Sequence, residues 1–417
     1  MKITIKIFFS ISVFLIFTLM LESAARFVFL KKVPMPIVQH WQNIQPYIMF
    51  STPASENNLR IWNDQYKKTN IKSLIIQNEQ GFPSKERINY AKKYDNNNRE
   101  DLVILTGGSA AWGVGATDNE STLDGVLEKR LNEKKKNFKV LNMAMGGWKS
   151  EQEFIALGMY GKNFAPEYII CMDGVNDVAV AVAHSQGAGY PMYYAGMEAF
   201  FKAYCFSQLK PVFFRGKIEN EILKYSYFAR WITGNTPISF SVTRDFSDPQ
   251  IERSIIREAN AGDAELQLQI YEQMLENISL LFPDSKIIFA LQPVPFDFKE
   301  TFHRLPNEPL TPKVIFAKQS RLNETLKNLK NQKAGLSAWP EARQWFLESA
   351  EIRISNLCEK INKKRKIKQT YFINLNAAFP EAFDQRKAYF IDPVHCNDAG
   401  YSVIAEKVAE NILRAQN

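Results

Sequence analysis

Ser109, Asp392 and His395 lie at opposite ends of this 417-residue chain, in patterns that could do nucleophilic chemistry. Ser109 follows two glycines in TGGSAAWG, directly behind the apolar run LVIL, and His395 follows Asp392 by three residues in IDPVHCNDAG. A serine can attack an ester when a base takes its proton, and an imidazole is a good base when a carboxylate fixes its tautomer. Alone, each segment is an ordinary turn with a capping serine or a structural histidine, but together they predict a catalytic triad.

Two other segments could stabilise the negative charge that develops when an ester is attacked. NMAMGGWKS contains Gly146 and Gly147, and DGVND contains Asn176. Such a reaction needs hydrogen-bond donors aimed at the developing oxyanion, and a glycine N–H and an asparagine amide can both serve. Each segment is weak evidence by itself. Four such landmarks in one chain favour acyl-transfer chemistry.

The elements that must position these residues are short apolar runs separated by segments with helical spacing. Strands are predicted at 102–106, 139–143, 168–173, 286–291 and 370–375, and helices include 121–135, 264–282 and 398–415. Strands that are apolar throughout and alternate with helices indicate a parallel sheet covered on both faces, a three-layer αβα sandwich. Ligands bind outside the carboxyl ends of such strands, where the candidate residues fall.

The N-terminus predicts export and attachment to a membrane. Residues 7–21 are free of charge, and Lys6 and Arg26 flank them. We expect residues 1–30 to be a retained signal anchor, because apolar character resumes at FVFL, residues 27–30; a signal peptide cut near 23–25 is the alternative. Either way, the catalytic domain is expected on the extracytoplasmic side, in a bacterial periplasm or at the cell surface.

The rest of the chain is expected to form a stalk and one domain. Residues 31–100 contain five prolines and no clear period, so we interpret them as a stalk and loosely packed lead-in, followed by a domain over 101–417. Insertions are expected at about 178–263 and 300–340. The first is rich in aromatic residues, which could form the core of a cap, stack on sugars or dock on a bilayer.

Composition excludes several other classes of protein. The net charge is +8, but the lysines are spread along the chain and no recognition motif accompanies them, so we expect no nucleic-acid partner. Four cysteines lie far apart without paired spacing, which argues against a zinc site and a disulfide scaffold, although one bridge is possible. We expect no metal and no organic cofactor.

The order of these segments resembles that of the SGNH hydrolase (GDSL esterase/lipase) superfamily, in particular its membrane-anchored bacterial members. TGGSAAWGVG, NMAMGGWKS, GVND and DPVHCNDAGYSVIAE stand where that superfamily has its four blocks, over roughly residues 100–417. The resemblance implies a flavodoxin-like fold with Ser109 as nucleophile, His395 as base and Asp392 as its orienting partner. It also implies an oxyanion hole made of the N–H groups of Ser109 and Gly147 and the side chain of Asn176.

Several residues around these blocks carry secondary expectations. Gly108 replaces the usual aspartate before the nucleophile, and Ala144 stands where a glycine is frequent; the first change could alter how the nucleophile loop is held. Asp398 is expected to cap the last helix, Asp177 to fix the loop of the third block, and Cys396 to be a packing residue.

The leading functional hypothesis is an exported, membrane-tethered serine esterase that removes short acyl groups, acetyl in particular, from cell-envelope carbohydrate. Its partners would be an acylated glycan or another ester substrate and the membrane. An O-acyltransferase that modifies a surface glycan through the same acyl-serine is a close alternative. A lipase or lysophospholipase, and a non-catalytic glycan-binding protein of the envelope, are the other hypotheses.

Overall fold

The fold is described from a computed structural model of the chain. The described residues are 16–24, 43–45, 49–51, 75–78, 81–84, 101–134, 137–183, 187–192, 260–305 and 308–416. The chain divides into two compact units, one made of residues 1–40 and 195–255 and the other of residues 41–194 and 256–417. In the first unit the described residues are 16–24, which are helical. Everything that follows concerns the second unit.

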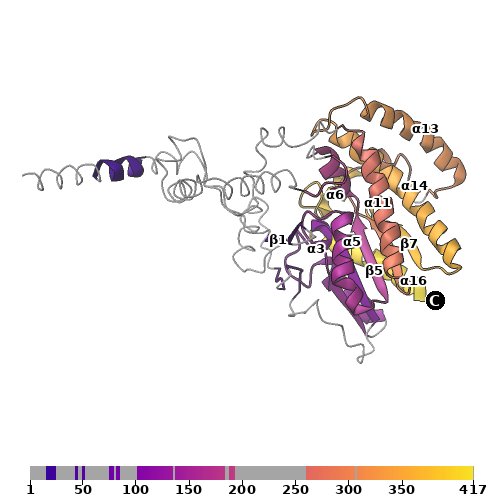
Figure 1. Ribbon diagram of the computed structural model, residues 1–417. Helices are drawn as coiled ribbons and strands as arrows, with labels where there is room; N and C mark the ends of the chain where they lie inside the picture. Colours follow the sequence, from indigo (N-terminus) through magenta and orange to yellow (C-terminus); the bar gives the residue numbers. More distant parts are fainter. Residues whose placement is uncertain are drawn as a thin grey trace, which may run out of the picture. The chain divides into compact units, whose positions relative to one another are not determined.

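A five-stranded parallel sheet forms the centre of the second unit (Figure 1). Its strands are β3 (Asp101–Gly107), β4 (Phe138–Asn142), β5 (Tyr168–Asp173), β6 (Lys286–Leu291) and β7 (Thr370–Asn374), in the order β4-β3-β5-β6-β7. All neighbouring pairs in this sheet are parallel. The five predicted strands are therefore confirmed within a residue or two. A separate antiparallel pair joins β1 (Asn43–Gln45) and β2 (Met49–Ser51).

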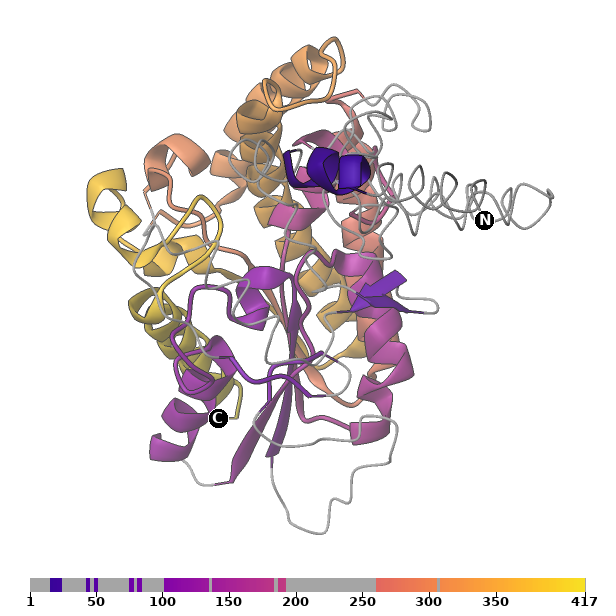
Figure 2. The same ribbon diagram turned by 90° about the vertical axis from the view of Figure 1, so that its left-hand side faces the viewer.

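Helices cover both faces of the sheet, as the alternating pattern predicts. Helices α4 (Leu123–Lys134) and α16 (Asp398–Gln416) pack together on one face, and α5 (Ser150–Met159), α11 (Asp263–Leu281) and α14 (Trp339–Arg365) lie on the other (Figure 2). Successive side chains of a strand point to opposite faces, so an apolar strand supplies two cores. Val103 and Ile170 accordingly belong to the core beneath α4 and α16, in which Leu127 and Ile404 are fully buried.

Short elements continue from the carboxyl ends of the strands. The four-residue helix α3 (Ser109–Trp112) follows β3, and α6 (Val175–Val178) and the π-helical turn η4 (Ala179–Ala183) follow β5. Between η4 and α11, residues 187–192 and 260–262 are described. Apart from residues 190–192, the aromatic part of the larger predicted insertion lies outside the described residues.

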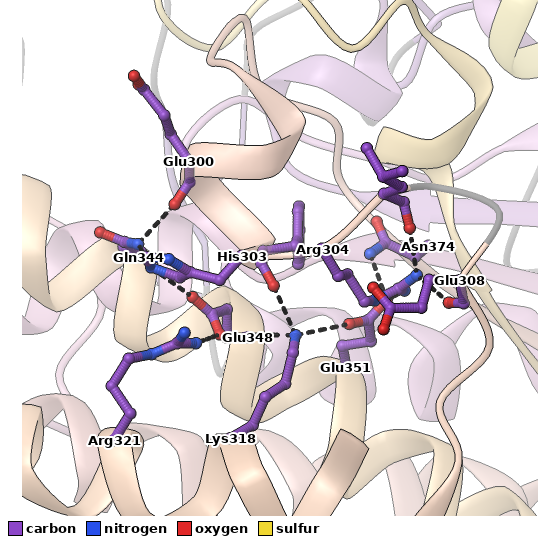
Figure 3. Close-up of polar contacts among 12 residues, drawn as sticks. Glu300, His303, Arg304, Glu308, Lys318, Arg321, Gln344, Glu348, Glu351 and Asn374 are labelled. Atoms are coloured by element: carbon purple, nitrogen blue, oxygen red, sulfur yellow. Dashed lines mark hydrogen bonds and ion pairs between the residues drawn. The ribbon is translucent and has the colours of Figure 1, made fainter. Parts of the chain in front are cut away.

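The smaller predicted insertion contains α12 (Phe298–Phe302) and α13 (Pro312–Leu329), which ion pairs join to α14 (Figure 3). Arg304 pairs with Glu351, Arg321 pairs with Glu348, and Lys318 lies 3.6 Å from Glu348 and 3.9 Å from Glu351. Both glutamate side chains are 1% exposed. This cluster, called the α12–α14 ion network below, fixes two helices to the third.

The structure tests the predictions for the N-terminal residues only in part. In the described stretches of the chain, no helix is both long enough and apolar enough to cross a membrane. Most of residues 1–30 lie outside those stretches, so the anchor stays a prediction. The loose packing expected for the lead-in is wrong at residues 75–78 and 81–84, because Ile75 and Phe82 are each 1% exposed.

Candidate active site

The structure brings Ser109, His395 and Asp392 into one hydrogen-bonded row. Ser109 Oγ lies 2.8 Å from His395 Nε2, and His395 Nδ1 lies 2.6 Å from Asp392 Oδ2. An ionised carboxylate can only accept, so Nδ1–H donates to Asp392, and Nε2 is left to accept the hydrogen of the serine hydroxyl. In this arrangement the imidazole can take the proton of Ser109 as the hydroxyl oxygen attacks.

Ser109 reaches this position because the turn after β3 is short and small. The strand ends at Gly107, and α3 begins at Ser109 itself. The backbone N–H of Trp112 donates to the carbonyl of Gly108, which closes the first helical turn. The serine hydroxyl is therefore presented at the carboxyl edge of the sheet.

The loop before α16 holds His395 through its own aspartate. Asp392 Oδ1 accepts hydrogen bonds from the backbone N–H groups of Val394 and His395, each at 2.8 Å, while Oδ2 faces the imidazole. Burial alone would raise the pKa of Asp392, but the hydrogen bond and charge of His395 and these two backbone donors hold it below its usual value. The carboxylate is therefore ionised at neutral pH and can stabilise an imidazolium.

The expected oxyanion donors come together beside the nucleophile. The backbone N–H groups of Ser109 and Gly147 make no hydrogen bond to any other residue in the described part of the chain. Gly147 has a φ of +83°, a left-handed conformation that favours glycine. Asn176 Nδ2 donates to the carbonyl of Trp148 at 2.8 Å, which fixes its amide and leaves a second N–H for a ligand.

The glycine at position 108 avoids a steric clash that could not be seen in the sequence. A Cβ atom at this position would lie 2.2 Å from Asn176 Nδ2 and 3.3 Å from the carbonyl oxygen of Trp148. Any side chain at position 108 would displace the Asn176 amide, so glycine makes room for it. The contact also shows that the first, second and third blocks meet at one point.

A buried polar network that sequence reasoning missed supports the second and third blocks. Asp177 Oδ1 accepts from Ser150 Oγ at 2.7 Å and from Gln267 Nε2 at 3.2 Å. Lys149 Nζ, whose side chain is 1% exposed, donates to Gln267 Oε1 at 3.0 Å and pairs with Glu151. The expectation that Asp177 fixes the loop is confirmed. The contribution of Gln267, on α11, had no signal in the sequence.

Gln292 holds the histidine loop from the end of β6, and Arg386 joins the segments that follow β6 and β7. Gln292, directly after β6, donates from Nε2 to the carbonyl of Val394 at 3.0 Å. Arg386, which is fully buried, donates from Nε to the carbonyl of Val294 and from Nη2 to the carbonyl of Asn376, both at 2.8 Å. The position of the polar residue Gln292 at a strand end is a sequence signal that could have predicted a role in the site.

The lead-in forms a wall of the same site. The ring of Phe82 meets the ring of Trp148 edge to face at 5.9 Å, directly beside Gly147. Trp112 Nε1, on the helix that begins with Ser109, donates to the carbonyl of Gly81 at 3.2 Å. Residues 81–84 thus contact both the nucleophile helix and the glycine block.

Two buried carboxyl groups at and near the end of β5 have no cationic partner among the described residues. Burial raises the pKa of Asp173, at the end of β5, to about 8, and raises that of Glu153, on α5, well above its usual value. The charge of Asp173 adds to the effect of burial on Glu153, and both carboxyl oxygens of Asp173 lack a hydrogen-bond partner among the described residues. Within the described ranges, no group of side chains is arranged to hold a metal ion.

Other singled-out residues lie away from the triad or take different roles. Asn397, not Asp398, caps α16, because Asn397 Oδ1 accepts the N–H of Gly400, whereas Asp398 accepts two hydrogen bonds from Thr117. Asn397 and Asp398 are adjacent, and both residue types are good N-caps. The prediction that Asp398 caps the helix is therefore wrong by one residue. His303, directly after α12, contacts Glu348 in the α12–α14 ion network.

The three described cysteines are not part of the chemistry. Cys171, Cys358 and Cys396 are buried free thiols, whereas Cys205 lies outside the described residues. Burial raises the pKa of the Cys396 thiol, which keeps it protonated and unreactive beside His395. The expectation that Cys396 is a packing residue is confirmed.

Comparisons with known proteins give distant structural likeness alone. No protein-family model matches the chain, and no curated protein matches its sequence. An acetyl-xylooligosaccharide esterase variant from Geobacillus is 12% identical, with a TM-score of 0.37, and the alignment covers 75% of this chain and 94% of that one. A family 3 carbohydrate esterase from Clostridium thermocellum is also 12% identical, with a TM-score of 0.34, and the alignment covers 76% of this chain and 98% of that one.

A lipase/acylhydrolase from Enterococcus faecalis is similar at the same level: 10% identity and a TM-score of 0.34, over 75% of this chain and 94% of that chain. Likeness this distant does not assign a family or an activity. The chemistry inferred for this chain therefore depends on its own geometry, the row that joins Ser109, His395 and Asp392.

Proposed function

We propose that this protein is a serine esterase of the SGNH type, which removes short acyl groups, acetyl above all, from cell-envelope carbohydrate. The observation that carries the proposal is the triad geometry, with Ser109 Oγ 2.8 Å from His395 Nε2 and His395 Nδ1 2.6 Å from Asp392. The available N–H groups of Ser109 and Gly147 add support, because a hydrolase of this kind also needs oxyanion donors.

In the proposed reaction, Ser109 Oγ attacks the ester carbonyl carbon while His395 Nε2 takes its proton. The carbonyl oxygen becomes an oxyanion held by the donors of Ser109, Gly147 and Asn176. The tetrahedral intermediate then expels the sugar alkoxide, which receives the proton from His395, and an acyl-serine remains. Water attacks the acyl-serine with His395 again as base, which releases the acid and restores the free hydroxyl.

Covalent labelling of the full chain tests this proposal. The detergent-solubilised protein is treated with a fluorophosphonate, its intact mass is measured, and turnover of p-nitrophenyl acetate is followed in parallel. We expect one label on the wild type, none on Ser109→Ala, and a fall in kcat of at least about 10⁴-fold in that variant. Ser320→Ala, an exposed serine on α13, is the matched control and should label and turn over like the wild type.

A folded wild type that neither labels nor turns over would overturn the proposal. So would labelling that persists in Ser109→Ala. Product analysis with an acetylated oligosaccharide then separates release of free acetate, which the esterase proposal requires, from transfer of acetate to a second sugar.

We further propose that residues 1–30 tether the protein to a membrane, with the catalytic unit on the extracytoplasmic side. The uncharged run at 7–21 supports this location. Cell fractionation should place the full chain in the membrane fraction, and protease added outside intact spheroplasts should digest its catalytic unit. Recovery in the cytosolic fraction would contradict the location without affecting the esterase proposal.

A further inference from the structure

One buried cation near the candidate active site has no counter-charge in the described part of the chain. Arg304, Lys318 and Arg321 each lie beside Glu348 or Glu351 of α14 (Figure 3). Arg343 belongs to the same helix, but it makes no hydrogen bond or ion pair with any described residue, and its buried Nε lacks a partner there. Each cation of the α12–α14 ion network is thus paired with a carboxylate, whereas Arg343 has no such partner among the described residues.

Two aromatic rings hold Arg343 in place instead. Its guanidinium carbon lies 3.6 Å from the centroid of the Phe296 ring and 5.4 Å from that of Trp339. The residue is 9% exposed, and burial lowers the pKa of its guanidinium to about 10, so it keeps its charge at neutral pH. Withdrawing a cation from water without a counter-ion is unfavourable, and an aromatic face compensates for that only in part.

Arg343 lies among the loops that support the catalytic residues. One helical turn beyond it, Phe346 packs against the backbone just before Asn176: a Cβ on Gly174 would be 3.7 Å from its ring. Phe296 belongs to the loop after β6, the loop in which Gln292 holds the carbonyl next to His395. The cation therefore sits at the carboxyl edge of the sheet, the edge where ligands bind in parallel sheets.

The chemistry of Arg343 selects an anionic ligand. A guanidinium that stacks on a ring through one face keeps its N–H groups in a planar fork, which matches the oxygens of a carboxylate or phosphate. We propose that Arg343 forms a subsite for an oxyanion group on the substrate, so that the protein acts on an acidic carbohydrate, one that carries uronate carboxylates or phosphates beside its ester. The substrate part of this inference rests on the proposed function.

Binding without turnover tests the subsite. Full-chain Ser109→Ala is titrated by calorimetry with trigalacturonate, with its neutral counterpart trigalactose, and with galactose 6-phosphate beside galactose. We expect trigalacturonate to bind at least ten-fold more tightly than trigalactose, and the phosphate pair shows whether phosphate is accepted as well. Arg343→Gln in the same background should abolish the preference, and Arg343→Lys, which keeps the charge without the fork, should retain only part of it.

Arg353→Gln is the matched control, because it removes one positive charge from the same helix at a residue paired with Glu272 on α11. It should leave the preference unchanged. Equal affinity of the starting protein for acidic and neutral sugars would overturn the proposal, as would an equal loss in Arg353→Gln. If Arg343→Gln fails to fold, the outcome for Arg343→Lys decides.

Failure of the esterase proposal would look different. A protein that prefers acidic sugars through Arg343 but is never labelled at Ser109 would be an acidic-glycan binder, and the subsite would stand. A protein that labels at Ser109 but shows no preference would be an esterase without this subsite.

Discussion

Asp392 and Glu348 are both partly or fully buried carboxylates in hydrogen-bonded clusters, yet their pKa values shift in opposite directions. The side chain of Asp392 is 24% exposed, and its hydrogen bonds hold its pKa low. That of Glu348 is 1% exposed, and burial raises its pKa despite the charges of Lys318 and Arg321. The difference teaches that a few well-placed donors and some contact with water keep a carboxylate ionised better than deep burial among cations does.

The two clusters also end differently. The row of Asp392 and His395 ends at the hydroxyl of Ser109, which can give its proton to His395 and attack a bound ligand. In the α12–α14 ion network the charges are matched by other charges of the protein, which suits it to hold helices together. The following predictions separate these two roles and are ordered by the expected size of each effect, with the greatest first.

The largest effect is expected at Asp392. Asp392→Asn keeps the shape but removes the acceptor that fixes the Nδ1–H tautomer of His395, so kcat for p-nitrophenyl acetate should fall by about 10⁴-fold. The free energy of unfolding, measured in urea, should change far less. Near-normal turnover would show that the row is not a catalytic triad. Asp384→Asn, at a fully exposed carboxylate in the same part of the chain, is the control.

The reverse pattern is expected in the α12–α14 ion network. Glu348→Gln leaves Lys318 and Arg321 without their nearest carboxylate, and breaking a buried pair costs about 3–5 kcal/mol of stability. Urea unfolding should show that loss, while kcat of the folded protein stays within a factor of two. Glu359→Gln, at an exposed position of α14, should alter neither quantity. A large loss of kcat without loss of stability would mean that the network takes part in catalysis.

A smaller effect tests how tightly the blocks fit at Gly108. Gly108→Ala places a methyl group against the Asn176 amide, so it should lower kcat by about 10²–10³-fold, as removal of one oxyanion donor does. Asn176→Ala should have a similar effect, and the double variant should be hardly worse than either alone. Additive effects would show that the two residues act separately.

The smallest effect is expected at Asp173, whose carboxyl has too few hydrogen-bond donors and cations around it to stay ionised at neutral pH. The pKa of Asp173 is raised to about 8 in the folded protein, above its unfolded value, so its contribution to stability is complete below about pH 4 and is lost as the pH rises through 8. Asp173→Asn should reduce that decline, which one proton limits to about 1.4 kcal/mol per pH unit. Urea unfolding at pH 5, 7 and 9 measures it, and an unchanged slope would contradict the assignment. Asp284→Asn, at an exposed site, is the control.

Much of the fold follows from the sequence because its signals are local. Each strand is a short apolar run, and the residues at three strand ends and in the last loop could be placed on one edge before any contact was known. What the sequence could not show depends on pairs far apart in the chain, such as Lys149 with Gln267 or Gln292 with Val394. Such pairs exist only once the sheet order is fixed.

The contact of Phe82 with Trp148 decides where the catalytic unit begins. Residues 81–84 precede the first strand of the central sheet, yet they cover an indole next to an oxyanion donor. A protein shortened at residue 100 would retain every triad residue and still expose Trp148 and Trp112 to water. The smallest active fragment should therefore start before residue 75, and the lead-in is as much a part of the candidate active site as the loops it touches.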